Sequence, residues 1–459
     1  MKTKLISINP TNLEIVKSYN IQDEAKVSDI ISKSYEVQEE WSSSDLDFKL
    51  NCLEKISSIL NDNRNSYANL MAIEMGKPLK QGVAEIEKCI FLCEYYQDQS
   101  KNILLKQNIK TENYKSYISY EPLGLILGIM PWNFPFWQVF RFAIPSLITG
   151  NGVILKHASN VQGCAHAIED IFLESGCPKN LFSNLVIPGS RVKTIIENDY
   201  ISAVTLTGST PVGKSVASIA SSNLKKTVME LGGSDPYIIL DDANLNQAAN
   251  ACISGRLING GQSCIAAKRI IITNKNHSKF VKILKKKLLT KVLGDPIDEV
   301  DIGPMVSIKA RDLIHDQVLK SIKEGAKLIL GGELIKDKGA FYPITILDHV
   351  SPDMTAFVEE IFGPVFSITI ASDEKDAIEL ANKTEFGLGA SIFTSDIQKG
   401  EFIASKKILA GSCFVNDFVK SDPRLPFGGI KNSGYGRELS YHGLMEFVNV
   451  KTIVVNKSE

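Results

Sequence analysis

The chain has 459 residues, of which 44% are hydrophobic and 22% are charged. That length exceeds what one hydrophobic core usually organises, so we expect at least two domains, and the composition is typical of globular proteins. The 51 basic and 52 acidic residues give a formal net charge of −1. Because no dense basic tract is present either, a nucleic-acid partner is not expected.

Neither a membrane-spanning segment nor a secretion signal is recognisable in the sequence. No apolar run approaches the ~20 residues needed to cross a bilayer, and the best stretch, from Leu123 to Trp132, is broken by Gly and Pro. The first residues lack the long apolar core of a signal peptide. The eight cysteines lack the regular spacing of a disulfide framework or a zinc site. We therefore expect a cytoplasmic protein with reduced thiols, no membrane partner and no bound metal.

The pattern of apolar residues predicts an α/β protein. Apolar residues recur at three- and four-residue intervals over residues 27–41, and a second helical pattern runs from about Lys49 to Met75. These patterns indicate helices that cover one face of a sheet. From Leu123 to Leu240, and again after Gly260, short apolar runs alternate with helical stretches. Such alternation is typical of βαβ units around a parallel sheet.

A small separate sheet is predicted near the C-terminus. From Tyr114 to Tyr120, aromatic and β-branched residues alternate with polar ones, as in an exposed antiparallel strand, and residues 448–455 offer it a partner. Copies of the chain are expected to associate through this sheet as a homodimer or homotetramer. The predicted parts are a dinucleotide-binding domain (1–110 and 122–231), a second α/β domain (232–428) and the oligomerisation strands (111–121 and 444–459).

A strand-to-helix turn at Gly208 and Ser209 is a candidate nucleotide site. Glycine lets the backbone approach a phosphate, and the first N–H groups of a helix attract anions. Taken alone, the motif is equally typical of a turn without a ligand. Lys156 ends another apolar run and stands where open α/β sheets bind ligands. A solvated lysine is the more common case at such a position.

Cys264 and Glu230 are the candidate catalytic groups. Cys264 follows two glycines in a segment poor in charge, and a glycine-rich bend can expose both its sulfur and its backbone N–H to a substrate. Most cysteines are instead small buried residues without a reactive role. Glu230 ends an apolar strand, which would raise its pKa and suit it to act as a general base near neutral pH. A strand-end glutamate in water is the commoner alternative.

Seven motifs occur together along the chain. They are PWNFP (131–135), LKHAS (155–159), LTGST (206–210), MELGG (229–233), GQSC (261–264), EEIFGP (359–364) and PFGGIKNSGYGRE (426–438). Their combination and order resemble the aldehyde dehydrogenase superfamily over roughly residues 74 to 438. The resemblance implies the aldehyde dehydrogenase fold, with a Rossmann-like cofactor domain, a catalytic α/β domain and a small oligomerisation sheet.

The resemblance also implies roles for the catalytic candidates. Cys264 would attack an aldehyde and form a thiohemiacetal, whose oxyanion would accept hydrogen bonds from the Asn133 side chain and the Cys264 backbone N–H. After hydride transfer to a nicotinamide, water activated by Glu230 would hydrolyse the thioester. Ala266, two residues after the nucleophile, excludes the adjacent-cysteine redox switch found in some relatives.

For the cofactor, the resemblance implies NADP or NAD. The pyrophosphate would lie at Gly208 and Ser209, and the adenosine ribose at Lys156. Relatives that prefer NAD often carry glutamate at the position of Ser159, and its absence removes a charge that would repel a 2′-phosphate. NADP use is therefore predicted. The remaining cofactor-binding residues implied by the resemblance are Trp132, Glu360 beside the nicotinamide ribose, and Phe362 beside the nicotinamide.

Within the superfamily, the segments GGSDP, PDMTAF and SDPRLPFGG resemble those of bacterial succinate-semialdehyde dehydrogenases. Arg141 would bind the far carboxylate of a four-carbon semialdehyde by a charge-assisted hydrogen bond, with Ser421 also in the substrate site. A helix-surface ion pair is the alternative role for Arg141. Some relatives carry a second arginine six residues before the nucleophile, where this chain has Ile258.

The predicted activity is thus oxidation of succinate semialdehyde to succinate with NAD(P). Three alternatives remain open: a dehydrogenase of another aldehyde such as glutarate semialdehyde, transfer of the acyl group to coenzyme A, and a non-catalytic binding protein of the same fold. Glu230 argues against coenzyme A transfer, because enzymes of that kind generally lack this base. Retention of Cys264, Glu230 and Asn133 together argues against a binding protein.

Overall fold

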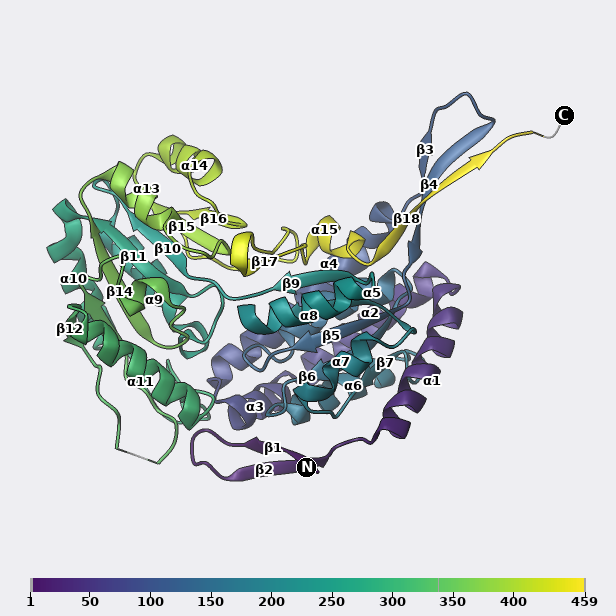
Figure 1. Ribbon diagram of the computed structural model, residues 1–459, viewed down its shortest axis with the longest axis horizontal. Helices are drawn as coiled ribbons and strands as arrows, with labels where there is room; N and C mark the ends of the chain where they lie inside the picture. The colour runs from purple at the N-terminus through teal and green to yellow at the C-terminus, as the bar shows by residue number, and fades with distance from the viewer. Residues whose placement is uncertain (1–2, 337, 458–459) are drawn as a thin grey trace.

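Two sheets, parallel except at one edge each, carry most of the chain in the computed structural model, which describes residues 3–336 and 338–457 (Figure 1). Along the first sheet the strands are β17 (Gly434–Tyr435), β9 (Lys226–Glu230), β8 (Ile201–Thr207), β5 (Leu125–Met130), β6 (Gly152–His157) and β7 (Phe182–Asn184). Along the second they are β12 (Lys327–Leu330), β13 (Thr345–Asp348), β14 (Val365–Ala371), β11 (Ala267–Thr273), β10 (Asp235–Ile239), β15 (Gly389–Phe393) and β16 (Ser412–Val415). The antiparallel edge strands are β17 and β12. The predicted α/β fold is confirmed.

Helices cover both faces of the first sheet. Side chains of β5 alternate between them: Ile126 joins the core formed with α2, α5 and α6, whereas Leu125 and Leu127 pack with α1, α7 and α8. A parallel strand covered on both faces is apolar throughout for this reason. The helices are α1 (Glu24–Ser42), α2 (Leu46–Asp62), α3 (Arg64–Met75), α4 (Leu79–Ile103), α5 (Trp137–Ile148), α6 (Gln162–Glu174), α7 (Val192–Ile196) and α8 (Thr210–Ser222), with the short η1 (Gly189–Arg191).

The second sheet has its own helices, which pack on it through apolar side chains such as Phe280 and Val318. They are α9 (Leu245–Leu257), α10 (Asn274–Leu288), α11 (Ile308–Lys323), α12 (Thr355–Val358), α13 (Glu374–Asn382) and α14 (Ile397–Lys406), with the short η2 (Ile258–Gly261); η3 (Lys431–Ser433) and α15 (Ser440–Met445) follow later in the chain. Among the described residues, no helix combines the length and the apolar character needed to cross a membrane.

The helical pattern predicted from about Lys49 to Met75 is two helices, α2 and α3, rather than one. They are separated at Asn63, whose backbone leaves the helical region (φ −109°, ψ 9°). The Asn63 side chain donates to the Ile59 carbonyl at 3.0 Å, and such local bonds compete with helix continuation. The helical spacing of apolar residues continues across Asn63. The sequence pattern therefore did not reveal that the helix is interrupted there.

The predicted pairing of the exposed strand with the C-terminal segment is confirmed. β18 (Val448–Val455) pairs antiparallel with β4 (Lys115–Pro122), and this sheet projects from the body of the molecule (Figure 1). It also takes in β3 (Gln107–Ile109), ahead of the predicted limit at residue 111. The sequence analysis missed a hairpin of β1 (Lys4–Ile8) and β2 (Ile15–Asn20). The domain limits stay predictions.

A buried carboxylate fixes α5 against α4. Glu85 of α4 accepts hydrogen bonds from the backbone N–H groups of Phe136 and Trp137, at 2.9 and 3.0 Å. These groups lie at the start of α5, where helical N–H groups lack partners within the helix. Lys77 forms a buried ion pair with the same carboxylate. The two helices are therefore held in one relative position, which matters because both contribute to the site.

Candidate active site

The predicted site residues gather at the carboxyl edge of the first sheet. Asn133 follows β5, Lys156 lies near the end of β6, Gly208 follows β8 and Glu230 ends β9. The carboxyl ends of parallel strands meet at one edge, where α/β proteins bind ligands. The position of these residues at one edge of the sheet therefore follows from the direction and order of the strands.

A cavity of about 280 Å³ lies between this edge and the second sheet. Two predicted cofactor residues, Lys156 and Ser159, do not line this cavity but lie at or just after the end of β6. We call this space the cofactor cavity. The other predicted cofactor residues all line it: Trp132, Gly208, Ser209, Glu360 and Phe362.

The cofactor cavity offers groups that suit the phosphate and the ribose of a dinucleotide. Ser209 precedes α8 and its side chain makes no capping bond, so the first N–H groups of the helix remain suited to a phosphate. A Cβ atom on Gly208 would lie 3.5 Å from the Leu206 side chain, an ordinary van der Waals contact, so packing alone does not require glycine at this position. Glu360 is held by Lys268 and by the Gly233 N–H, both at 3.1 Å. A ribose hydroxyl could hydrogen-bond to a carboxylate fixed in this way.

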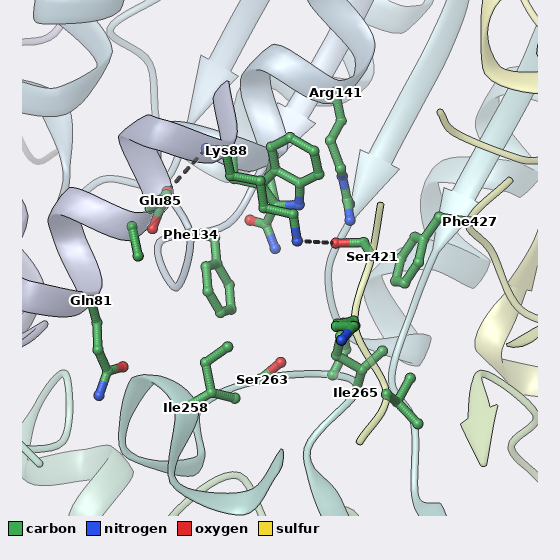
Figure 2. Close-up of a pocket in the computed structure, with 16 residues that line it drawn as sticks. Gln81, Glu85, Lys88, Phe134, Arg141, Ile258, Ser263, Ile265, Ser421 and Phe427 are labelled. Atoms are coloured by element: carbon green, nitrogen blue, oxygen red, sulfur yellow. Dashed lines mark hydrogen bonds between the residues drawn. The ribbon is translucent and has the colours of Figure 1, made fainter. Parts of the chain in front are cut away.

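A second cavity, of about 200 Å³, lies on the other side of Cys264 (Figure 2). This volume is below the ~300–1,000 Å³ of pockets that hold drug-sized ligands, so the cavity suits a small molecule. We call it the substrate cavity. Side chains from α4, α5, η2 and three loops line it, including Gln81, Lys88, Phe134, Trp137, Gln138, Arg141, Ile258, Ile265, Ser421 and Phe427.

Cys264 lines both cavities. The chain reaches it through a tight bend with positive φ at Asn259 (52°), Gly260 (62°) and Gly261 (80°). A Cβ atom on Gly261 would lie 2.3 Å from the Gly363 carbonyl oxygen, so this bend requires glycine there. The glycines before the cysteine therefore serve to bring the thiol to the junction of the two cavities.

The thiol of Cys264 holds its proton at neutral pH. Burial raises its pKa to about 12, opposed by the positive charges of Lys268 and Arg141. Lys268 donates to the carbonyl oxygens of Ser263 and Cys264, at 2.8 and 2.7 Å, and so fixes the backbone on either side of the cysteine. Attack on an electrophile must be accompanied by loss of the thiol proton.

Asn133 is fixed beside Cys264 in the cofactor cavity. Its Nδ2 donates to the Gln262 carbonyl at 3.0 Å, and its Oδ1 accepts from Gln138 at 3.2 Å. Asn259 donates to the Asn133 backbone carbonyl at 2.7 Å. An amide carries two N–H donors, so one of them is left for an oxyanion. Preorganised donors of this kind stabilise charge that develops during a reaction.

Glu230 lies behind the two cavities rather than on their walls. It is 1% exposed, and burial followed by the negative charge of Glu438 raises its pKa well above the ordinary value. The raised pKa expected from the sequence is confirmed. Arg141 counteracts the rise and forms an ion pair with Glu438 at 2.7 Å. A negative charge on Glu230 also raises the pKa of the Cys264 thiol. The two groups are therefore close enough to influence each other's protonation.

Residues 1–453 match the model of the aldehyde dehydrogenase family. The chain belongs to this family. A thiol at the junction of the cofactor cavity and the substrate cavity is the arrangement that such a dehydrogenase requires, because hydride must pass directly from substrate to cofactor.

Several relatives of this aldehyde dehydrogenase carry similar names. The chain is 42% identical over 452 residues to succinate semialdehyde dehydrogenase [NAD(P)+] Sad of Escherichia coli K12, with 98% of each chain covered. It is 42% identical over 450 residues to a probable succinate-semialdehyde dehydrogenase [NADP(+)] of Synechocystis, covering 98% of this chain and 99% of that protein. The structure of succinic semialdehyde dehydrogenase from Streptococcus pyogenes in complex with NADP+ is 36% identical, with a TM-score of 0.96 over 99% of this chain and 100% of that one.

The predicted substrate residues Arg141 and Ser421 both line the substrate cavity of this family member. The Arg141 guanidinium stacks over the Phe427 ring at 4.9 Å, in addition to its ion pair with Glu438. That partner was not foreseen from the sequence. Arg424, in the same motif as Ser421, is exposed and paired with Asp422, so it lies outside the cavity.

Sequence reasoning missed Lys88. Its ammonium donates to Ser421 Oγ at 2.7 Å in the substrate cavity. Gln81, Glu85 and Lys88 recur at helical spacing and all line that cavity. The same spacing is typical of a solvated helix face, so only the position of α4 against α5 distinguishes the two cases.

A second polar cluster lies elsewhere in the described part of the chain. Ligand atoms of His277, Asp348 and His349 are within 4.8 Å of one another, and His277 Nε2 lies 2.8 Å from Asp348 Oδ1. Two imidazoles and a carboxylate could hold a transition metal. The cluster lines neither the cofactor cavity nor the substrate cavity.

Proposed function

We propose that this chain oxidises succinate semialdehyde to succinate, with NADP or NAD as hydride acceptor. The observation that carries the proposal is the position of Cys264 between the cofactor cavity and a small cavity with two cationic side chains, Lys88 and Arg141. A cationic end opposite a nucleophile suits an aldehyde that bears a carboxylate at its far end. The names of the relatives support the same substrate.

In the first half of the reaction, the Cys264 sulfur bonds to the aldehyde carbon and the thiol proton passes to a base. The carbonyl oxygen becomes an oxyanion that accepts hydrogen bonds from Asn133 Nδ2 and the Cys264 N–H. Bound nicotinamide supplies the hydride acceptor, with the cavity residues Trp132, Glu360 and Phe362 holding that end of the cofactor. Loss of hydride leaves an acyl thioester on Cys264.

In the second half, water attacks the thioester carbon. Glu230 accepts a proton from that water, the carbon–sulfur bond breaks, and the carboxylate product leaves. The Cys264 sulfur regains a proton. Burial raises the pKa of Glu230 well above its ordinary value, and a carboxylate with a raised pKa is a stronger base than an exposed one, which supports Glu230 as the base.

A panel of three aldehydes tests this function. Reduction of NADP and of NAD is followed at 340 nm with succinate semialdehyde, glutarate semialdehyde and butyraldehyde. We expect kcat/KM to be highest for succinate semialdehyde and at least about tenfold lower for butyraldehyde. Equal values for these two would remove the substrate assignment, and a higher value for glutarate semialdehyde would favour the longer substrate. Dependence of product formation on coenzyme A would instead indicate acyl transfer to a thiol, and no reduction with any aldehyde would indicate a binding protein.

The NADP preference rests on Ser159, a neutral residue at the predicted position of the adenosine ribose. The relatives from Synechocystis and Streptococcus pyogenes, described with NADP, support it. The same assay measures kcat/KM for the two cofactors. A value with NAD that exceeds the value with NADP by about tenfold or more would contradict the preference.

Association of the chain as a homodimer or homotetramer is also a proposal. Val450 and Val454 of β18 are 57% and 52% exposed, and exposed apolar residues on an edge strand favour pairing with another copy. Light scattering after size-exclusion chromatography measures the assembly. The expected cytoplasmic location stays a prediction, supported by eight free thiols.

A further inference from the structure

Lys88 places an ammonium group inside the substrate cavity. It projects from α4 toward Ser421 (Figure 2). Its Nζ donates to Ser421 Oγ at 2.7 Å and lies 4.6 Å from the centre of the Trp137 ring. Both contacts hold the ammonium at one place on the cavity wall, although neither neutralises its charge.

In the part of the chain that the structure describes, the Lys88 ammonium forms no ion pair. Within residues 3–336 and 338–457, no carboxylate lies within 4.0 Å of its Nζ. Glu85, one turn earlier on α4, is committed to Lys77 and to the N–H groups of Phe136 and Trp137. A cation in a partly apolar cavity gains from an anion that enters beside it.

Arg141 is differently placed. It is 3% exposed, and its guanidinium already lies 2.7 Å from a Glu438 carboxylate oxygen. An anion that approached Arg141 would also approach Glu438, and like charges repel. Ile258, on the same cavity wall, contributes no charge. Arg141 is therefore partly committed to Glu438 but keeps an Nε without a hydrogen-bond partner among the described residues, whereas the Lys88 ammonium has no carboxylate within ion-pair distance there.

We propose that the Lys88 ammonium and the Ser421 hydroxyl together bind the far carboxylate of the aldehyde substrate. Because Ser421 Oγ accepts its hydrogen bond from Lys88, its own proton remains free to be donated to a carboxylate oxygen. The anchor therefore offers two donors from two chain segments. Arg141, which lines the same cavity and is paired with Glu438, offers its Nε, unpartnered in the described part of the chain, as a further donor. This inference rests on the proposed function, since it requires a substrate with a carboxylate.

Burial and the charge of Arg141 lower the pKa of Lys88 to about 8. A bound carboxylate would raise that pKa again, so substrate binding and protonation of Lys88 favour each other.

The test replaces Lys88 with methionine, which keeps much of the length of the side chain and removes its charge. We expect Lys88→Met to raise KM for succinate semialdehyde about 10- to 100-fold with kcat within a few-fold, because the loss falls on ground-state binding. The kcat/KM for butyraldehyde should stay within about twofold, which also shows that the variant folds. Ser421→Ala should raise the same KM by a smaller factor, and Lys88→Arg should restore part of the selectivity.

Lys80→Met is the matched control, because Lys80 lies on the same helix, is exposed and does not line the cavity. It should leave both aldehydes unaffected. If wild-type enzyme prefers succinate semialdehyde and Lys88→Met keeps that preference, the anchor is wrong and the function stands. If wild-type enzyme shows no preference for the carboxylated aldehyde, the proposed function and the anchor both fall. If Lys88→Met is inactive with butyraldehyde, the preference for succinate semialdehyde over butyraldehyde is measured in Lys88→Gln instead. Loss of that preference in Lys88→Gln would support the anchor, and its retention would contradict it.

Discussion

The two cavities that meet at Cys264 are built from different parts of the fold. The cofactor cavity is lined mainly by residues just after strand ends, such as Trp132 and Gly208. The substrate cavity is lined by side chains from α4, α5, η2 and three loops, such as Lys88 and Ser421. Strand direction and order fix the first, whereas helix packing and long-range contacts fix the second. Substrate choice can therefore change through a few side chains while the cofactor site keeps its form.

The largest expected effect is at the junction of the two cavities. Glu230→Gln keeps the shape of the side chain and removes its ability to accept a proton. Because the proposed mechanism makes Glu230 the base that activates the water cleaving the thioester, steady-state turnover should fall roughly 10²- to 10⁴-fold. Formation of the thioester needs no water, so a burst of reduced nicotinamide close to one per active site should persist. Stopped-flow absorbance at 340 nm, followed by mass spectrometry of the acylated protein, measures both.

The size of the burst shows whether Glu230 is needed for thioester formation or only for thioester hydrolysis. If both the burst and the steady state disappear, Glu230 is needed for the attack of Cys264 rather than for hydrolysis. A fall of less than about tenfold with no acylated protein would mean that another group serves as the base. Glu87→Gln is a suitable control, since Glu87 is an exposed carboxylate on α4 that lines neither cavity.

Much of the cofactor side could be predicted from the sequence, because it depends on local features. Each strand of the first sheet with a long apolar run was recognisable, and the residues after those strands must meet at one edge. Gly208 and Gly261 could be recognised from the sequence as turn residues, the first before a helix and the second before Cys264. The two-residue strand β17 was not, because its pairing with β9 places Gly434 beside Glu230 from a distant part of the chain.

The substrate side could be predicted only in part, because its polar contacts join distant residues. Lys88 and Ser421 are 333 positions apart in the sequence, and no local pattern couples them. Arg141 was identified through resemblance, but its ion pair with Glu438 was not. The sequence pattern of a helix is the same whether a charged residue on it faces water or a cavity. Its role is decided by which helix packs against it.

The next largest effect should fall on the cofactor side alone. Ser159→Glu places a carboxylate after β6, near the predicted adenosine ribose. It should lower kcat/KM with NADP about tenfold or more through repulsion of the 2′-phosphate, while NAD, which lacks that phosphate, changes much less. Ser159→Ala controls for loss of the hydroxyl. Equal losses with both cofactors would mean that Ser159 lies away from the 2′ position, and any change in aldehyde selectivity would contradict the independence of the two cavities.

The smallest effect concerns pH and falls on the substrate side. Lys88 faces Arg141 of α5, Asp422 of the loop after β16, and Glu85 and Cys89 of its own helix, and its pKa is lowered to about 8. The carboxylate binds the protonated form, so its affinity is complete below that pKa and is lost as pH rises through it. Between about pH 7 and about pH 8.5, KM for succinate semialdehyde should therefore rise roughly fourfold.

The effect on Lys88 is isolated by dividing that KM by the KM for butyraldehyde, because titration of groups at Cys264 affects both aldehydes. In Lys88→Arg the ratio should be flat, since a guanidinium keeps its proton throughout this range. A ratio that stays flat in wild-type enzyme would mean that the anion is held by a group that does not titrate, and Arg141 would then regain the anchoring role. A slope that persists in Lys88→Arg would assign the titration to another group, because Lys88 is absent from that variant.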